Sequence, residues 1–207
     1  SAEVYLDANE NPFENGINRY PDPYQNRVKE RLAKIKGVSA KNILLGNGSD
    51  EVLDLIFRTF CDPGKDEVIL LPPTYGMYAV LAQLNNVKTT AIPLDENFEL
   101  DTKAILDAVN DNTKVIFVCS PNNPSANAIP MEQIQILLDQ FSGLVVVDEA
   151  YIDFTGLESW TQRLNEFPNL IVTQTLSKAY GLAGIRLGTC FSSKEIIAVL
   201  NKIKPPY

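Results

Sequence analysis

The chain has 207 residues, of which 45% are hydrophobic and 21% are charged, a balance typical of a folded globular protein. Its formal net charge of −8 disfavours a nucleic-acid partner, because neutralising phosphates needs a basic surface. The sequence contains no histidine, which removes Ser-His-Asp hydrolysis and most zinc sites from consideration, and no run of about 18 apolar residues that would span a membrane.

The first forty residues differ from the rest of the chain. Asn-Glu-Asn-Pro at 9–12 and Tyr-Pro-Asp-Pro at 20–23 are typical of extended or turn segments, since proline disfavours helix in the residue before it. A helix is expected over 24–36, with Gly37 at its end. We therefore expect residues 1–40 to form an N-terminal arm with a first helix.

From residue 41 onward, strand and helix patterns alternate. Most strand candidates are continuous Val, Ile and Leu runs, typical of strands covered on both faces. Alternation of this kind predicts an α/β fold, a mainly parallel seven-stranded sheet with helices on both faces. Cys119 and Cys190 fall in two of these runs, which predicts buried, reduced thiols and a cytoplasmic protein. Strands are expected over 42–45, 68–71, 89–93, 115–120, 144–148, 170–174 and 187–192, and helices over 50–60, 74–85, 102–110 and 131–141.

The most informative segment is Thr-Leu-Ser-Lys-Ala-Tyr-Gly-Leu-Ala-Gly-Ile-Arg at 175–186, directly after an apolar strand run. Lysine forms Schiff bases with carbonyls when its amine is partly deprotonated, and Lys178 lies between the hydroxyls of Thr175 and Ser177. Arg186 follows eight residues later, and hydroxyls with a guanidinium suit a phosphate. Pyridoxal 5′-phosphate (PLP) carries both an aldehyde and a phosphate, so the spacing suggests a PLP lysine. A surface-loop lysine is the alternative.

Other marked segments follow strands of the same sheet, and ligands bind beyond the carboxyl ends of such strands. Gly-Asn-Gly-Ser-Asp-Glu at 46–51 opens a helix, whose free amides and positive dipole end attract a phosphate. Asp50 as a simple helix cap is the alternative. Glu51 stands where the third glycine of a dinucleotide fingerprint belongs, which disfavours a nicotinamide dehydrogenase. Ser-Pro-Asn-Asn-Pro at 120–124 fixes two side-chain amides between prolines, which suits holding the polar edge of a ligand; a simple rigid turn is the alternative.

Two further strand ends carry groups that suit a planar cofactor. Tyr75 follows the second strand and is placed to lay its ring against such a cofactor, unless it only packs in the core or at the surface. Asp148 follows four apolar residues, where a carboxylate is costly to bury without a cationic partner. A protonated pyridine nitrogen would be that partner, and Tyr151 could hydrogen-bond the phenolic oxygen of the ring. Asp148 as a helix cap is the alternative.

Together these segments resemble the PLP-dependent aminotransferases of fold type I, the aspartate aminotransferase type. Two of them, at 147–151 and 175–186, are specific to that superfamily, whereas Leu-Asp-Ala-Asn-Glu-Asn-Pro at 6–12 and Arg-Tyr-Pro-Asp-Pro at 19–23 are similar to its histidinol-phosphate subgroup. The resemblance covers essentially all of the chain. It implies that residues 41–207 form the PLP-binding large domain.

The resemblance also implies residue roles. Lys178 would carry the cofactor and shuttle the substrate's Cα proton, Asp148 would pair with the pyridine nitrogen, and Tyr151 with Asn123 would bind the ring oxygen. Tyr75 would stack on the ring. The remaining cofactor-binding residues would surround the phosphate: Gly48, Ser49, Asp50, Thr175, Ser177 and Arg186. Tyr20 would reach the phosphate of the neighbouring subunit's cofactor in a homodimer.

Two features depart from the family pattern. Ser125 and Ala126 follow Asn-Pro where the family usually has Thr-Gly, so we expect the hydroxyl to survive and the glycine turn to be lost. Family members also continue into a small C-terminal domain with the arginine that binds the substrate's carboxylate or phosphate. Because this chain ends at Tyr207, we expect a truncated chain that lacks this small domain.

The activity implied is transfer of the amino group of histidinol phosphate to 2-oxoglutarate in histidine biosynthesis, with small-molecule substrates and no metal, nucleic-acid or membrane partner. Two alternatives stay open. A PLP decarboxylase or lyase of the threonine-phosphate type would share the cofactor residues, because substrate orientation selects among PLP reactions. The chain could also be an inactive PLP-binding fragment.

Overall fold

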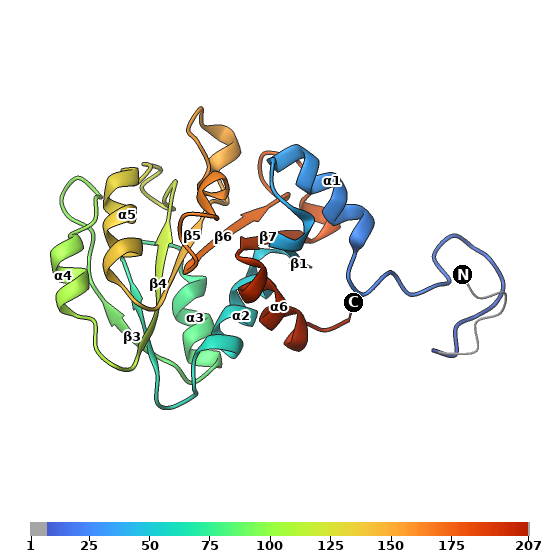
Figure 1. Cartoon of the computed structure of the whole chain (residues 1–207), viewed down its shortest axis with the longest axis horizontal. Helices are drawn as coiled ribbons and strands as arrows, with labels where there is room; N and C mark the ends of the chain where they lie inside the picture. Colours follow the sequence, from blue (N-terminus) through green and yellow to red (C-terminus); the bar gives the residue numbers. More distant parts are fainter. Residues whose placement is uncertain (1–7, 207) are drawn as a thin grey trace.

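The computed structural model describes residues 8–206, so positions 6 and 7 of the first motif, and position 207, lie outside the described residues. Within this range, seven strands form one sheet at the centre of the molecule (Figure 1). They are β1 (Ile43–Asn47), β2 (Glu67–Leu70), β3 (Lys88–Ala91), β4 (Thr113–Cys119), β5 (Leu144–Asp148), β6 (Leu170–Thr175) and β7 (Leu187–Ser192).

The strands lie in the order β1-β7-β6-β5-β4-β2-β3. From β6 to β3 all neighbours pair in parallel, whereas β7 is antiparallel to both β6 and β1. The mainly parallel sheet predicted from the sequence is therefore confirmed. Because β7 runs the other way, its first residue lies at the same edge as the carboxyl ends of the other strands.

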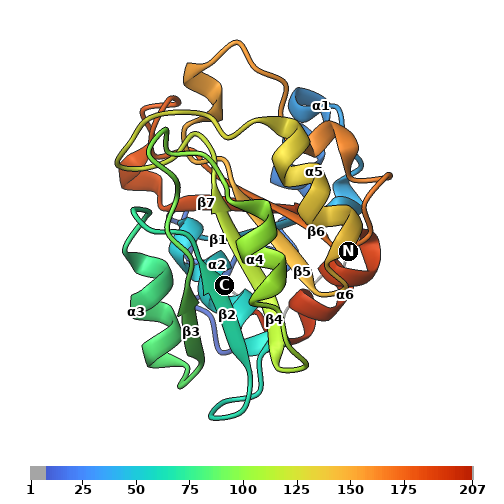
Figure 2. The same cartoon turned by 90° about the vertical axis from the view of Figure 1, so that its left-hand side faces the viewer.

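Helices cover both faces of the sheet, as predicted (Figure 2). One apolar cluster joins the sheet to α1, α4 and α5 through Leu32, Ile105 and Leu137. The other joins it to α2, α3 and α6 through Leu53, Leu81 and Leu200, among others. The helices are α1 (Asn26–Lys36), α2 (Ser49–Phe60), α3 (Met77–Leu84), α4 (Thr102–Asp107), α5 (Met131–Gln140) and α6 (Lys194–Ile203), with short 3₁₀ turns η1 (Ala40–Asn42), η2 (Ile152–Phe154), η3 (Trp160–Arg163) and η4 (Ala183–Ile185).

Strand β5 shows why continuous apolar runs are needed here. Val145 and Val147 face the cluster on the α5 side, whereas Val146 faces the cluster on the α2 side, and all three are fully buried. Burying each such side chain stabilises the fold by about 1.5–3 kcal/mol. This strand carries Asp148 as its last residue, so the packing of three valines fixes where the carboxylate lies.

Most element bounds differ from the predictions by one to three residues, and one helix was not predicted. Strand β1 extends two residues further than expected, to Asn47, because it stays paired with β7 through Gly46 and Gly188. Helix α3 begins at Met77 rather than at 74, which leaves Tyr75 outside the helix. Helix α6 was not predicted, although Ser193 caps it: the Ser193 hydroxyl accepts a hydrogen bond from the amide of Ile196, the third residue of the helix, at 3.4 Å.

Residues 8–25 precede α1 and lead away from the sheet (blue in Figure 1). Within this arm the Glu10 carboxylate accepts a hydrogen bond from the Tyr20 amide at 2.6 Å and pairs with the Arg19 guanidinium at 3.1 Å. The domain division at residue 40 stays a prediction. None of the helices in the described part of the chain combines the length and hydropathy needed to cross a lipid bilayer.

Candidate functional site

A cavity of about 170 Å³ opens at the carboxyl edge of the sheet. Its walls come from the segments that follow β1, β2, β4, β5 and β6, together with the residue before β7. All of the predicted site residues except Tyr20 line it, from elements far apart in the sequence. The lining comprises Gly48, Ser49, Asp50, Tyr75, Cys119, Asn123, Asp148, Ala150, Tyr151, Thr175, Ser177, Lys178 and Arg186.

One end of the cavity is built on a close approach of two backbone segments. Gly48 has a φ of 84°, and a Cβ atom there would lie 2.5 Å from Nη2 of Arg186, so glycine lets the guanidinium pack against the turn. The Gly48 amide donates to the Arg186 carbonyl oxygen at 2.9 Å. Gly188 is equally constrained, since its Cβ would lie 2.2 Å from the Ser49 nitrogen. The start of α2 therefore lies directly beside the guanidinium.

The turn before α2 also explains why Glu51 stands where a dinucleotide fingerprint would have its third glycine. The Glu51 carboxylate accepts a hydrogen bond from the Asn47 amide at 2.6 Å, which closes the turn. Asp50 does not cap the helix. Its Oδ1 accepts a hydrogen bond from the Tyr75 hydroxyl at 3.1 Å, and burial together with Asp50 raises the pKa of Tyr75 to about 12.

The two cations of the cavity, Lys178 and Arg186, are both exposed. Among residues 8–206, no carboxylate lies within ion-pair distance of either one. Lys178 Nζ lies 5.6 Å from the centre of the Tyr151 ring, and Arg186 Nη1 donates to the Ala183 carbonyl oxygen at 3.2 Å. The surface-loop alternative for Lys178 is thus right about its exposure, but this lysine lines the cavity.

Asp148 forms the buried floor of the cavity, with 3% of its surface exposed. Its Oδ2 accepts a hydrogen bond from the Tyr78 hydroxyl at 2.7 Å, and its Oδ1 accepts one from the Ala150 amide at 3.2 Å. Burial raises the pKa of Asp148, while these two hydrogen bonds act in the opposite direction. The carboxylate caps no helix, because η2 begins only at Ile152. No cation neutralises it among the described residues.

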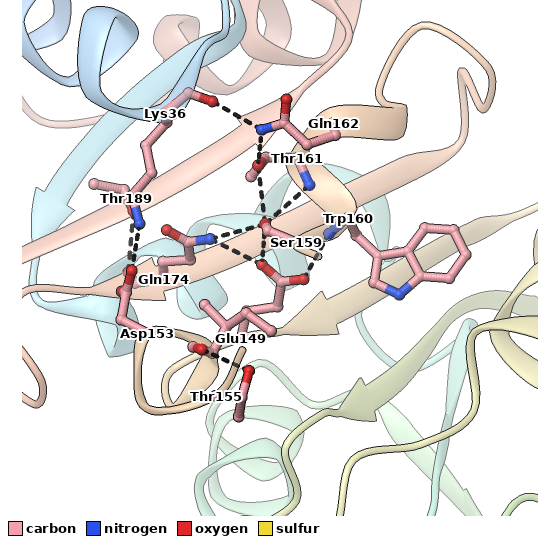
Figure 3. Close-up of polar contacts among 11 residues, drawn as sticks. Lys36, Glu149, Asp153, Thr155, Ser159, Trp160, Thr161, Gln162, Gln174 and Thr189 are labelled. Atoms are coloured by element: carbon pink, nitrogen blue, oxygen red, sulfur yellow. Dashed lines mark hydrogen bonds and ion pairs between the residues drawn. The ribbon is translucent and has the colours of Figure 1, made fainter. Parts of the chain in front are cut away.

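The carboxylate of the next residue, Glu149, is surrounded by hydrogen-bond donors of the protein (Figure 3). Its carboxylate accepts hydrogen bonds from the Ser159 hydroxyl at 2.6 Å, the Trp160 amide at 2.7 Å and Gln174 Nε2 at 2.8 Å. Burial raises the pKa of Glu149, and the three donors oppose that shift. With three donors, this carboxylate is satisfied by the protein and is absent from the lining of the cavity.

The loop after β4 corrects one expectation. The turn that Ala126 was expected to lose is present, since Ala126 adopts a left-handed φ of 64° and its amide donates to the Asn122 carbonyl oxygen at 2.8 Å. Ser125 keeps the hydroxyl, which donates to Asn127 Oδ1 at 2.5 Å. The loop thus holds Asn123 in the cavity wall without a glycine.

Sequence reasoning missed three residues of this region. Cys119 and Ala150 line the cavity: Cys119 directly precedes the motif at 120–124, and Ala150 lies within the motif at 147–151 without having been assigned a role. Tyr78 lies behind Asp148 and follows Tyr75 by three residues, which puts both rings on one side of the same segment. Tyr20 is 56% exposed on the arm and does not reach the cavity of its own chain.

Comparison with known proteins agrees with this geometry. Residues 3–207 match the family described as Aminotransferase class I and II. A histidinol-phosphate aminotransferase from Christiangramia forsetii is 64% identical over 204 residues, covering 99% of this chain and 58% of the relative. This chain therefore spans little more than half the length of that curated relative.

Solved structures share the fold. The histidinol-phosphate aminotransferase from Clostridium acetobutylicum superposes with a TM-score of 0.83 at 26% identity, covering 91% of this chain and 57% of the other. The enzyme of that name from Sinorhizobium meliloti, solved in complex with pyridoxal-5′-phosphate, also gives 0.83, at 27% identity, over 91% of this chain and 52% of the other. The predicted membership is confirmed: the chain belongs to the aminotransferase class I and II family.

Proposed function

We propose that this chain carries the PLP-binding domain of a histidinol-phosphate aminotransferase, which converts histidinol phosphate and 2-oxoglutarate into imidazole acetol phosphate and glutamate. One observation carries the proposal: exposed Lys178, exposed Arg186 and buried Asp148 meet in a single cavity at the carboxyl edge of the sheet. The names of relatives with up to 64% identity support the choice of substrate.

The residues of the cavity fit PLP group by group. A phosphate would meet the Arg186 guanidinium, which has no carboxylate partner among residues 8–206, and the free amides at the start of α2. The hydroxyls of Ser49, Thr175 and Ser177 lie in the same wall. A protonated pyridine nitrogen would supply the cation that buried Asp148 lacks.

Each side chain then has a defined task. PLP, when bound, supplies an aldehyde that joins the substrate amine and a protonated ring that takes up electron density from the substrate Cα. Lys178 Nζ would take the proton from the substrate Cα as a general base and deliver it to C4′ of the cofactor as a general acid. Asp148 would balance the charge of the ring nitrogen, and Tyr151 with Asn123 would donate to the ring oxygen. Tyr75 would pack on the ring face.

The proposal extends to assembly and location. We propose a homodimer in which Tyr20 of one subunit reaches the cofactor phosphate of the other, because the arm leads away from the sheet (Figure 1) and exposes Phe13 and Ile17. We also propose a cytoplasmic protein, since Cys61, Cys119 and Cys190 are all free and buried.

The activity is tested by following glutamate formation from histidinol phosphate and 2-oxoglutarate. The assay compares this chain with a chain extended to the full length of its relatives. We expect turnover by the extended chain and none by the 207-residue chain. Lys178→Ala in the extended chain should reduce turnover at least 1,000-fold, on the order expected for loss of a general base that also holds the cofactor. Lys103→Ala, at an exposed lysine paired with Asp107, is the matched control and should keep full activity.

Two results would contradict the proposal. Release of carbon dioxide from threonine phosphate, without glutamate formation, would favour the decarboxylase alternative. Tight PLP binding by the extended chain without turnover of either substrate would favour a PLP-binding protein without this activity.

A further inference from the structure

Tyr78 is a fully buried polar side chain that contacts the site without lining the cavity. Its surface is 0% exposed, and its hydroxyl donates to Asp148 Oδ2 at 2.7 Å. The bond joins α3 to the end of β5, across 70 residues of sequence. The phenol therefore contacts the carboxylate from within the core, whereas Asp148 itself also lines the cavity.

The Tyr78 ring is held in place by aromatic packing. It stacks on Phe117 with a centroid distance of 5.2 Å and an interplanar angle of 20°, and Phe117 stacks on Phe57 at 5.0 Å. Its edge meets the Tyr75 ring at 5.5 Å. Moving the hydroxyl away from Asp148 would disrupt these contacts, so the donor is fixed relative to the carboxylate.

The chemistry of a fixed donor is specific. A carboxylate oxygen accepts more than one hydrogen bond, so Asp148 can still accept one from a group in the cavity that it lines. Burial raises the pKa of Tyr78 well above its ordinary value, so the phenol stays a donor. Such a donor stabilises the ionised carboxylate, which makes the carboxylate a weaker base toward a ring N–H that it faces.

We infer that Tyr78 is a positioning residue that keeps Asp148 ionised and oriented toward the pyridine nitrogen of the cofactor. The inference rests on the PLP site proposed above. Without the hydroxyl, the proton shared by ring nitrogen and carboxylate should shift from the nitrogen toward Asp148. The ring would then lose its positive charge.

The test is the ¹⁵N chemical shift of ring-labelled PLP bound to the protein. For the wild type we expect the shift of a protonated pyridine. Tyr78→Phe keeps the stacked ring but removes the donor, so the shift should move toward that of neutral pyridine. Phe117→Leu is the matched control, since it loosens the same stack but keeps the hydroxyl. We expect it to lower stability and leave the shift unchanged.

The outcomes separate this inference from the proposed function. Wild-type protein that binds no PLP would contradict the proposed function and the role of Tyr78 with it. If all three proteins bind PLP with the same ¹⁵N shift, the site stands and the role of Tyr78 is refuted. An equal displacement in Phe117→Leu and Tyr78→Phe would also refute it, because packing alone would then explain the effect.

Discussion

The two edges of the sheet bury carboxylates in opposite ways. At the edge where β2, β3 and β4 begin, buried Glu67 accepts hydrogen bonds from Asn110 Nδ2 at 2.5 Å and the Thr113 hydroxyl at 3.0 Å, and pairs with Lys88 Nζ at 3.0 Å. At the carboxyl edge, buried Asp148 has two hydrogen-bond donors and no cation among the described residues. At the first edge, protein groups neutralise the charge of Glu67, whereas at the carboxyl edge the charge of Asp148 is available to a ligand.

This difference appears in the pKa values. Burial acts to raise the pKa of Glu67, but the donors and Lys88 outweigh it, so the pKa lies below its ordinary value. Burial dominates at Asp148, whose pKa is raised. A charged Glu67 therefore stabilises the fold, while a charged Asp148 opposes folding until a cation arrives.

Among the effects on cofactor affinity and stability, the largest is expected at Arg186. Arg186→Ala should weaken PLP binding about 100-fold, roughly 3 kcal/mol, because a guanidinium without an internal carboxylate partner is available to a phosphate. Arg163→Ala is the control, since that guanidinium is paired with Glu166 at 2.6 Å, and PLP affinity should not change. Equilibrium titration measures the PLP affinity, and equal affinity in wild type and Arg186→Ala would show that this guanidinium does not bind the phosphate.

At the opposite edge, Glu67→Gln should lower the free energy of unfolding by about 2 kcal/mol, because it removes the charge from the buried acceptor of the Asn110 and Thr113 hydrogen bonds. The folded pKa of Glu67 is lowered, so its stabilisation is present above its unfolded pKa of about 4.3 and is lost as pH falls through the folded value. Urea unfolding at several pH values should show the gap between wild type and variant closing in acid. A gap that widens in acid would contradict the sign.

In contrast to Glu67→Gln, Asp148→Asn should stabilise the cofactor-free protein at neutral pH. Because the folded pKa of Asp148 is raised, its favourable contribution is present below its unfolded pKa and is lost as pH rises through the folded value. At neutral pH the variant should therefore be more stable than wild type by about 1 kcal/mol. Adding PLP should stabilise wild type more than the variant. Thermal unfolding with and without PLP measures both, and a destabilised cofactor-free variant would count against the account.

The smallest effect concerns the loop beside Asn123. Ala126 has a φ of 64°, a conformation that costs a non-glycine residue about 1 kcal/mol. Ala126→Gly removes that strain but adds about 0.5 kcal/mol of unfolded-chain entropy, so we expect a net gain of about 0.5 kcal/mol. Ala128→Gly is the control in the same loop and should lose stability. A loss in both variants would show that the turn carries no strain.

The sequence predicted elements best where packing is uniform. The bounds of β5 and β7 agree with prediction because their apolar runs are buried on both faces. The start of α3 was misplaced because Tyr75 is drawn toward Asp50 and the cavity, a tertiary contact that no local pattern contains. Helix α6 was overlooked, although Ile196, Ile197 and Leu200 have helical spacing.

The site shows the same division. Strand-end residues such as Lys178 and Asp148 could be predicted, because parallel topology alone brings strand ends to one edge. The contact of Tyr78 with Asp148 could not be predicted, because the two residues are 70 positions apart and the sequence around Tyr78 is typical of a core helix. Tyr20 stays a prediction, because its proposed contact would be made across a dimer and not within one chain.

The central claim is that the carboxyl edge holds PLP on Lys178. Borohydride reduction of PLP-treated protein, followed by proteolysis and mass mapping, tests it directly. The account predicts a pyridoxyl group on the peptide that contains Lys178, and none on that peptide in Lys178→Ala. Labelling of Lys103 or Lys114 in place of Lys178, or no labelled peptide at all, would contradict it.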